Sequence, residues 1–356
     1  MAETEARPRF LVSASPHIRQ DVSVPRVMYG VVIALIPALV GSVYFYGLRA
    51  LFLTLIACVT CLATEAVIQR MRNVPVTIAD GSALVTGILL AFNLPPGVPW
   101  WMPVVGSIFA IAIGKQVFGG LGYNPLNPAL LGRAFLLASW PVAMTTTWLP
   151  AKGGTLSGAA LRGVDVVTQA TPLALMRKVN EILADPSSTT HQLVQAREVL
   201  TELGSADTML NLFVGRIGGC IGETSVLLLL VGAAYLLFKR YIDWRIPLAY
   251  VGTVALLTWT FGGANGFFTG NALFHVLAGG LVLGAFYMAT DMVSSPVTPK
   301  GMMIFGVGCG VITVVIRLIG GYPEGVSYSI LLMNIAVPLI DRHTRPKILG
   351  EVKQRG

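Results

Sequence analysis

The residues best placed to do chemistry form one polar stretch, Asp165-Val166-Val167-Thr168-Gln169-Ala170-Thr171-Pro172. It offers one carboxylate and two hydroxyls just before a segment that predicts a helix. A threonine followed by proline is typical of a helix start, because the hydroxyl accepts from free backbone N–H groups and proline favours the first helical position. By residue type alone, Thr171 is therefore predicted to cap a helix that begins at Pro172.

A second set of candidates consists of ionisable residues inside apolar runs. A charged side chain at the centre of a membrane helix costs about 2.5–3.5 kcal/mol, so each such residue is a functional candidate. Asp291 is favoured for ion handling because it lies beside an expected break in a helix. Structural pairing with an opposite charge is the competing interpretation for every one of them. The four acids predicted to couple to ions are Asp291, Glu324, Glu223 and Asp80, and the other embedded charges are Glu65, Lys115, Arg133 and Arg317.

Composition places the chain in a membrane. Of its 356 residues, 54% are hydrophobic and 12% are charged, where a soluble domain carries about 25% charged residues. The net charge of +8 is typical of a membrane protein that keeps its basic residues in the cytoplasm, and it does not indicate nucleic-acid binding. The sequence shows no metal-ligand cluster, nucleophilic triad or phosphate loop, so we predict no metal and no catalytic residue.

Apolar runs long enough to cross a bilayer occur in two sets of five. The predicted fold is an all-α polytopic membrane protein of ten helices. The predicted divisions are a cytoplasmic segment 1–26, a first five-helix unit 27–145, a polar loop 146–218, a second five-helix unit 219–340 and a basic tail 341–356. The runs are predicted at 27–46, 49–69, 81–95, 101–118 and 129–145, then at 219–238, 246–262, 272–290, 301–319 and 324–340.

The distribution of Lys and Arg predicts how the chain is oriented. With ten spans both termini lie on one side, and that side holds almost all the basic residues of the tails and short loops. The short loops of the opposite side hold only Arg49. Positive residues stay in the cytoplasm, so we expect cytoplasmic termini and an outward-facing polar loop.

Three motifs recur in order in the two units, which predicts an internal repeat. Leu39-Val40-Gly41 recurs as Leu230-Val231-Gly232, Leu84-Val85 recurs as Leu281-Val282, and Gly119-Gly120 recurs as Gly320-Gly321. Because each unit has an odd number of helices, the two units must be inverted relative to each other. Inverted repeats with interrupted helices are typical of transporters.

The segment 119–128, Gly-Gly-Leu-Gly-Tyr-Asn-Pro-Leu-Asn-Pro, has two interpretations that the residues leave open. Its backbone amides can cradle a polar ligand. It can equally form a tight turn between helices, where Gly and Asn supply positive φ and Pro starts the next helix.

Nearly the whole chain resembles one family of membrane proteins. That family contains the D subunit of the Rnf complex, a ferredoxin:NAD oxidoreductase that translocates Na⁺ or H⁺, and the B subunit of the sodium-pumping NADH:quinone oxidoreductase. The short N-terminal segment favours the Rnf branch. The resemblance is carried by Ser15-Pro16-His17-Ile18-Arg19, Asp80-Gly81-Ser82-Ala83-Leu84-Val85-Thr86-Gly87, Phe118-Gly119-Gly120-Leu121-Gly122-Tyr123-Asn124-Pro125, Gly222-Glu223-Thr224-Ser225, Ala289-Thr290-Asp291, Gly320-Gly321-Tyr322-Pro323-Glu324-Gly325-Val326 and Leu332-Met333-Asn334.

The resemblance implies a covalent cofactor. In the family, a threonine closing a D-x-x-[S/T]-x-A-T motif carries FMN through a phosphoester bond, which a separate flavin transferase makes outside the membrane. Asp165, Thr168, Ala170 and Thr171 match that motif, and Gln169 departs from the small residue usual at its position. The family is also linked to a noncovalent riboflavin, to a neighbouring protein of the complex that holds a second FMN, and to the bacterial inner membrane.

Two other functions remain open from the residues. The inverted repeats and broken helices also fit a small-solute channel or transporter, which would carry solute without a flavin. A purely structural membrane scaffold is the third interpretation, in which loss of Thr171 leaves electron transfer unchanged.

Overall fold

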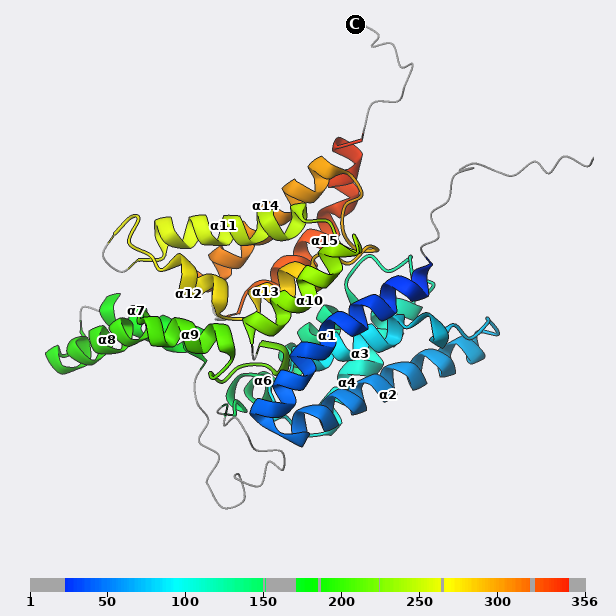
Figure 1. Ribbon diagram of the computed structural model, residues 1–356, viewed down its shortest axis with the longest axis horizontal. Coiled ribbons are helices and arrows are strands. Elements are labelled where there is room, and N and C mark those ends of the chain that lie inside the picture. The colour runs from blue at the N-terminus through cyan, green and yellow to red at the C-terminus, as the bar shows by residue number, and fades with distance from the viewer. Residues whose placement is uncertain are drawn as a thin grey trace, which may run out of the picture.

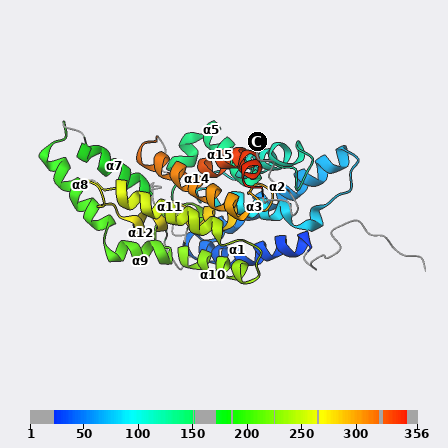
Figure 2. The ribbon, with the colours of Figure 1, turned by 90° about the horizontal axis from the view of Figure 1, so that it is seen from above.

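The computed structural model describes residues 23–149, 151, 171–184, 187–223, 225–263, 266–320 and 324–345. Every regular element in these ranges is a helix, which confirms the predicted all-α class for the part described. Two groups of helices form the body of the molecule, and an arm of three helices projects from one side of it (Figure 1). The view from above shows the same arm at one end of the elongated body (Figure 2).

The first group contains the helices before the long polar loop. Gly47, at φ +76°, makes the turn between the first two helices, a conformation that suits glycine. The Asn127 side chain accepts from the N–H groups of Ala129 and Leu130 and so caps the fifth helix. The helices are α1 (Val24–Tyr46), α2 (Leu48–Met71), α3 (Ser82–Phe92), α4 (Trp101–Ile111) with a π-helical extension Ala112–Gln116, α5 (Pro128–Ser139) and α6 (Pro141–Thr146).

The second group contains the helices that follow the arm. Its third member is divided at Gly279 and Gly280, which have φ of +71° and +64°. It consists of α10 (Val226–Phe238), α11 (Arg245–Phe261), α12 (Ala272–Leu277), α13 (Leu281–Leu283) with a π-helical extension Gly284–Met288, α14 (Pro299–Leu318) and α15 (Val326–His343).

The structure differs from the predicted runs at two breaks. The run 272–290 is divided at the glycine pair, and the run 129–145 is divided at Trp140, where Pro141 starts the new helix α6. Proline lacks the N–H that would continue a helix. Two successive glycines with positive φ cannot form part of a right-handed helix. Hydropathy does not register either break because the residues around both are apolar.

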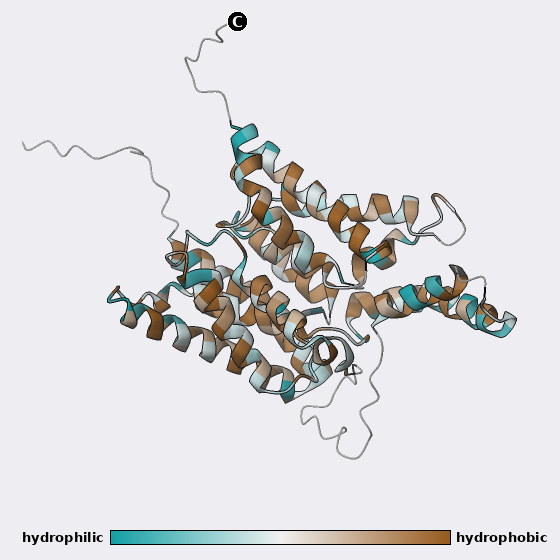
Figure 3. Cartoon of the chain, turned by 180° about the vertical axis from the view of Figure 1, so that it is seen from behind, coloured by the Kyte–Doolittle hydropathy of each residue, from teal (hydrophilic) through white to brown (hydrophobic). Residues whose placement is uncertain are grey.

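Three of the described helices are long and apolar enough to cross a membrane by length and composition: α1, α2 and α14. Three shorter apolar helices, α3, α5 and α10, accompany them. Hydrophobic residues cover much of the body, whereas polar residues gather on the arm and at helix ends (Figure 3). These features support a membrane location.

The arm consists of α7 (Pro172–Ala184), α8 (Thr190–Leu203) and α9 (Ala206–Val214). The N-terminus of α8 has a capping box, in which Thr189 accepts from the Gln192 N–H and the Gln192 side chain accepts from the Thr189 N–H.

Helices α1 and α10 join the two groups and approach each other at Gly232. A Cβ added to Gly232 would collide with the Ala34 carbonyl oxygen and with the Tyr287 hydroxyl. The hydroxyl of Tyr287 donates to the Leu229 carbonyl at 2.7 Å and so has no room to move freely. This contact needs a residue without a side chain.

We therefore expect Gly232→Ala to destabilise the body. Overpacking of this kind costs about 1–3 kcal/mol. A lower thermal unfolding midpoint in detergent is the expected observation. Gly252→Ala on α11 is the matched control, because a Cβ there meets no atom within 4 Å. Equal midpoints for the two variants would show that α1 and α10 are not so closely packed.

Candidate functional site

Thr171 caps the first helix of the arm, as its sequence predicts. Its Oγ accepts from the Ala174 N–H at 3.3 Å, and its carbonyl accepts from the Leu175 N–H at 2.9 Å. Pro172 is the first residue of α7. The side chain is buried, with 5% of Thr171 exposed. The candidate motif residues Asp165, Thr168 and Ala170 lie outside the described residues.

Apolar packing holds this helix start against the broken helix formed by α12 and α13. Leu173 and Met176 of α7 pack with Phe274 and Ala278 at the end of α12. Gly279 makes the approach possible, because a Cβ there would collide with the Leu173 Cδ1. This packing positions Thr171 at the surface of the second group of helices, beside the Gly279–Gly280 break.

A small cavity, of about 20 Å³, opens directly at Thr171. Its wall runs from the cap through the loop before α10 to the glycine break. Two of the four predicted ion-coupling acids, Glu223 and Glu324, lie in that wall together with Thr171. The structure therefore brings the predicted flavin-bearing residue and two predicted ion-coupling residues to one place.

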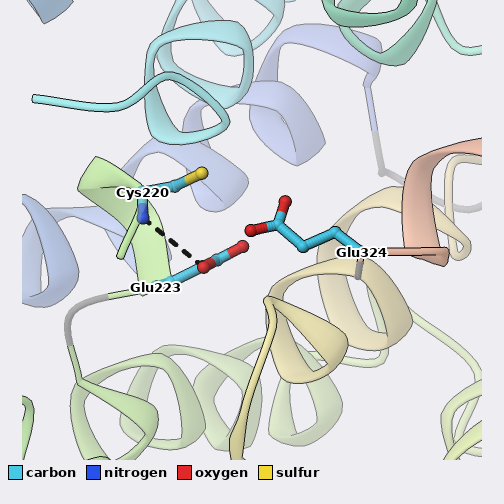
Figure 4. Close-up of side chains that lie close together, drawn as sticks. All are labelled: Cys220, Glu223 and Glu324. Atoms are coloured by element: carbon cyan, nitrogen blue, oxygen red, sulfur yellow. Dashed lines mark hydrogen bonds between the residues drawn. The ribbon is translucent and has the colours of Figure 1, made fainter. Parts of the chain in front are cut away.

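The two acids belong to a compact cluster with a thiol (Figure 4). Donor atoms of Cys220, Glu223 and Glu324 all lie within 4.8 Å of one another. The Cys220 N–H donates to Glu223 Oε2 at 3.4 Å, and the Cys220 thiol donates to the Asn93 carbonyl. In the described ranges this is the one set of three such donors close enough to hold a metal ion.

Arg133 of α5 provides the positive charge beside this cluster. Its guanidinium pairs with the Glu324 carboxylate and donates to the Ser327 hydroxyl at the start of α15. Arg133 is buried, and Glu324 lies 191 positions away in the chain. The pair therefore ties the first group of helices to the second, and it leaves Glu223 as an adjacent carboxylate.

The other two predicted acids lie at the opposite end of the body. Asp291 accepts from the Ser294 hydroxyl at 2.8 Å and lines a cavity of about 80 Å³. Asp80 accepts from both the N–H and the hydroxyl of Ser82, at 2.7 and 2.5 Å, and Ser82 lines the same cavity. Glu223 and Glu324 thus share one cavity wall, whereas Asp291 and Ser82, the partner of Asp80, lie in the wall of another.

The cavity at Asp291 also contains part of the segment 119–128, for which the residues allow either a ligand cradle or a turn. Asn124 and Asn127 lie in its wall with Lys115. The Asn124 amide nitrogen donates to the Leu126 carbonyl, as in a turn, while its Oδ1 is buried without a partner among the described residues. The segment is thus both a turn and a cavity wall.

Lys115 and Glu65, two of the embedded charges, form a pair that the sequence does not indicate. The Lys115 ammonium donates to both Glu65 oxygens, at 2.7 and 2.8 Å, and to the Ser82 hydroxyl at 2.6 Å. Gln69 and Gln116 donate to the same carboxylate. No local pattern could have revealed this pair, because its partners lie 50 positions apart.

Fold and site together describe a helical membrane protein whose projecting arm presents a capped threonine to a broken helix. The model of the NQR2, RnfD, RnfE family matches residues 11–350, and the chain belongs to that family. The resemblance stated from the motifs is therefore confirmed.

Relatives align over almost their entire length. The chain is 47% identical over 98% of its length to the D subunit of the proton-translocating ferredoxin:NAD(+) oxidoreductase complex of Clostridium ljungdahlii, covering 99% of that protein. It is 50% identical over 96% of its length to the D subunit of the Na(+)-translocating ferredoxin:NAD(+) oxidoreductase complex of Acetobacterium woodii, covering 96% of it. It is 41% identical over 92% of each chain to the D subunit of the ion-translocating oxidoreductase complex of Stutzerimonas stutzeri.

Proposed function

We propose that this chain is the D subunit of an ion-translocating ferredoxin:NAD oxidoreductase complex, carrying covalent FMN on Thr171. The full-length similarity to proteins of that name carries the first part of the proposal. It favours the ferredoxin-linked complex over the quinone-reductase branch of the family and over a solute channel. The chain is a membrane component, and its partners are the other proteins of the complex, among them a second one that holds FMN.

The geometry at Thr171 suits a phosphoester. Esterification removes the Oγ proton and leaves the oxygen at the N-terminus of α7, where free N–H groups and the helix dipole favour the negative phosphate. Glycine at 279 lets Leu173 of the first turn pack closely against the helix break and so fixes the position of the cap. When bound, the flavin supplies the electron transfer, and the protein holds and tunes it.

Expression of the chain with and without a flavin transferase tests the attachment of FMN to Thr171. A band that fluoresces under ultraviolet light on a denaturing gel should appear only when the transferase is present. A purified chain that conducts solute in liposomes and takes up no flavin would instead favour the channel.

For the cavity at Asp291 we propose a noncovalent flavin of the riboflavin type. The buried Oδ1 of Asn124 has no donor among the described residues, and the side chains of Asn127 and Thr86 add further polar groups to an otherwise apolar wall. Such a mixture is typical of small-molecule sites. Flavin extracted from the purified complex by acid, without proteolysis, should fall in an Asn124→Leu variant.

We further propose ten membrane helices in two inverted repeats. Equivalent pairs pack in both groups: α2 on α4 as α11 on α14, and α4 on α5 as α14 on α15. Between the groups, α1 contacts its equivalent α10, and α5 contacts its equivalent α15. These contacts support a two-fold relation between the halves.

The positions of the two chain ends and of the basic residues support cytoplasmic termini, with the flavin-bearing arm outside. The start of α1 and the end of α15 lie on the side of the body away from the arm (Figure 1). Basic residues occupy this side: Arg26, Arg70, Arg72, Lys239, Arg240, Arg245, Lys300, Arg342 and Arg345. Arg49, at the arm side, instead donates to the carbonyls of Pro96, Gly97 and Val98.

Ion coupling is proposed for both pairs of acids, and the shared cavity makes Glu223 the sharper test. Glu223→Gln keeps the size of the side chain and leaves the Arg133–Glu324 pair in place. We expect this variant to keep its flavin and its electron transfer and to lose the ion gradient, as we also expect for Asp291→Asn. The gradient is measured in proteoliposomes with the complete complex. Pumping retained by either variant would remove that residue from the coupling path.

A further inference from the structure

A second cavity lies beside α7, on the side of the Gly279–Gly280 break away from the acid cluster. It has a volume of about 390 Å³ and lies between the arm and the ends of α12 and α14. Leu173 lies in the walls of this cavity and of the one at Thr171, so the two are neighbours. Its other polar or basic wall residues are Arg177, Asn180, Glu181, His275 and Arg317.

Two buried nitrogen atoms in this wall lack partners. Arg317 donates through Nη1 to the His275 carbonyl, at 2.5 Å, and through Nη2 to the carbonyls of Ala278 and Gly279. Its Nε has no partner among the described residues, nor does the Nδ1 of His275. These residues are 5% and 4% exposed. Buried polar atoms are ordinarily paired, so two orphans in one cavity wall indicate a ligand with hydrogen-bonding atoms.

Charge and size distinguish the two cavities as places for a flavin ring. The cavity at Thr171 has a volume of only about 20 Å³ and contains the carboxylates of Glu223 and Glu324, which repel the electron-rich ring of a reduced flavin. The larger cavity contains the buried guanidinium of Arg317, and its one acid, Glu181, is paired with Arg177 at 2.8 Å. The larger cavity is therefore the better match.

We propose that the isoalloxazine ring of the flavin on Thr171 docks in this second cavity, between α7 and the ends of α12 and α14. Leu173 and Met176 follow Thr171 within about 8 Å of helical rise, which a ribityl phosphate arm can span. Arg317 and His275 face the polar edge of the ring. The charge of Arg317 raises the reduction potential of the flavin, because it stabilises added electrons. This inference rests on the proposed attachment at Thr171.

Fluorescence of the full chain, matured with the transferase, tests where the ring lies. Tryptophan in contact with a flavin quenches its emission. Asn180→Trp, in the cavity wall, should quench the covalent flavin, whereas Lys178→Trp, on the exposed side of the same helix, should leave it unchanged. Equal emission from the two variants would place the ring elsewhere.

The reduction potential gives a second, independent readout. Asn180→Asp adds a negative charge in the cavity without changing the size of the side chain, and Gln195→Glu adds the same charge at an exposed position on α8. We expect a more negative flavin potential for Asn180→Asp and for Arg317→Gln, and little change for Gln195→Glu and Arg317→Lys. Equal potentials in all four would overturn the docking. A chain without a fluorescent band on a denaturing gel would instead overturn the attachment itself.

Discussion

A complex that contains Thr171→Ala is expected to show no fluorescent band for this chain and no electron transfer from ferredoxin to NAD. The phosphoester requires the threonine Oγ, and the residues that follow it in the first turn of α7, Pro172, Leu173 and Ala174, carry no hydroxyl. The measurements are ultraviolet fluorescence on a denaturing gel and ferredoxin-dependent NAD reduction by the purified complex. Thr171→Ser should keep both signals, because serine offers the same oxygen.

The substitution to alanine also removes a helix cap, which costs about 1 kcal/mol by itself. Thr171→Asn separates the two effects, since asparagine caps a helix well and cannot form the ester. We expect Thr171→Asn to fold like the native chain and to lack the covalent flavin. Fluorescence or full electron transfer in this variant would contradict the proposed role of Thr171.

The largest expected loss of stability follows from breaking the pair between Lys115 and Glu65. Their side chains are 2% and 0% exposed, so Lys115→Met leaves a carboxylate buried without its cation. Breaking a buried pair costs about 3–5 kcal/mol. The expected result is a markedly lower thermal unfolding midpoint in detergent, with much of the loss recovered in the double variant Lys115→Met with Glu65→Gln.

An exposed ion pair provides the control. Arg177 and Glu181 form a pair at 2.8 Å with side chains 32% and 61% exposed. Such a pair contributes about 0.3–0.5 kcal/mol, so Arg177→Met should hardly change the unfolding midpoint. Similar midpoints for Lys115→Met and Arg177→Met would show that Lys115 is not buried as described.

The positions of the apolar helices were readable from the sequence because a bilayer demands long hydrophobic runs. The breaks within two of these runs were not, since Gly279, Gly280 and Trp140 are as apolar as their neighbours. Backbone conformation, rather than hydropathy, divides the helix at the glycine pair.

At the candidate site, the local feature was predictable and the distant contacts were not. The cap at Thr171 depends on two adjacent residues, Thr171 and Pro172, and is confirmed. The pairing of Arg133 with Glu324 depends on packing between the two groups of helices, which one sequence does not reveal. Asp291 was favoured among the acids because of its neighbouring break, yet Glu223 and Glu324 are the acids that share a cavity with Thr171.

Mass spectrometry of the mature chain tests the central claim most directly. Trypsin releases one peptide, residues 163–177, which contains both Thr168 and Thr171. Fragmentation of this peptide should locate the mass of one FMN, less one water, on Thr171. An unmodified peptide from a chain matured with its transferase, or a flavin located on Thr168, would contradict the account.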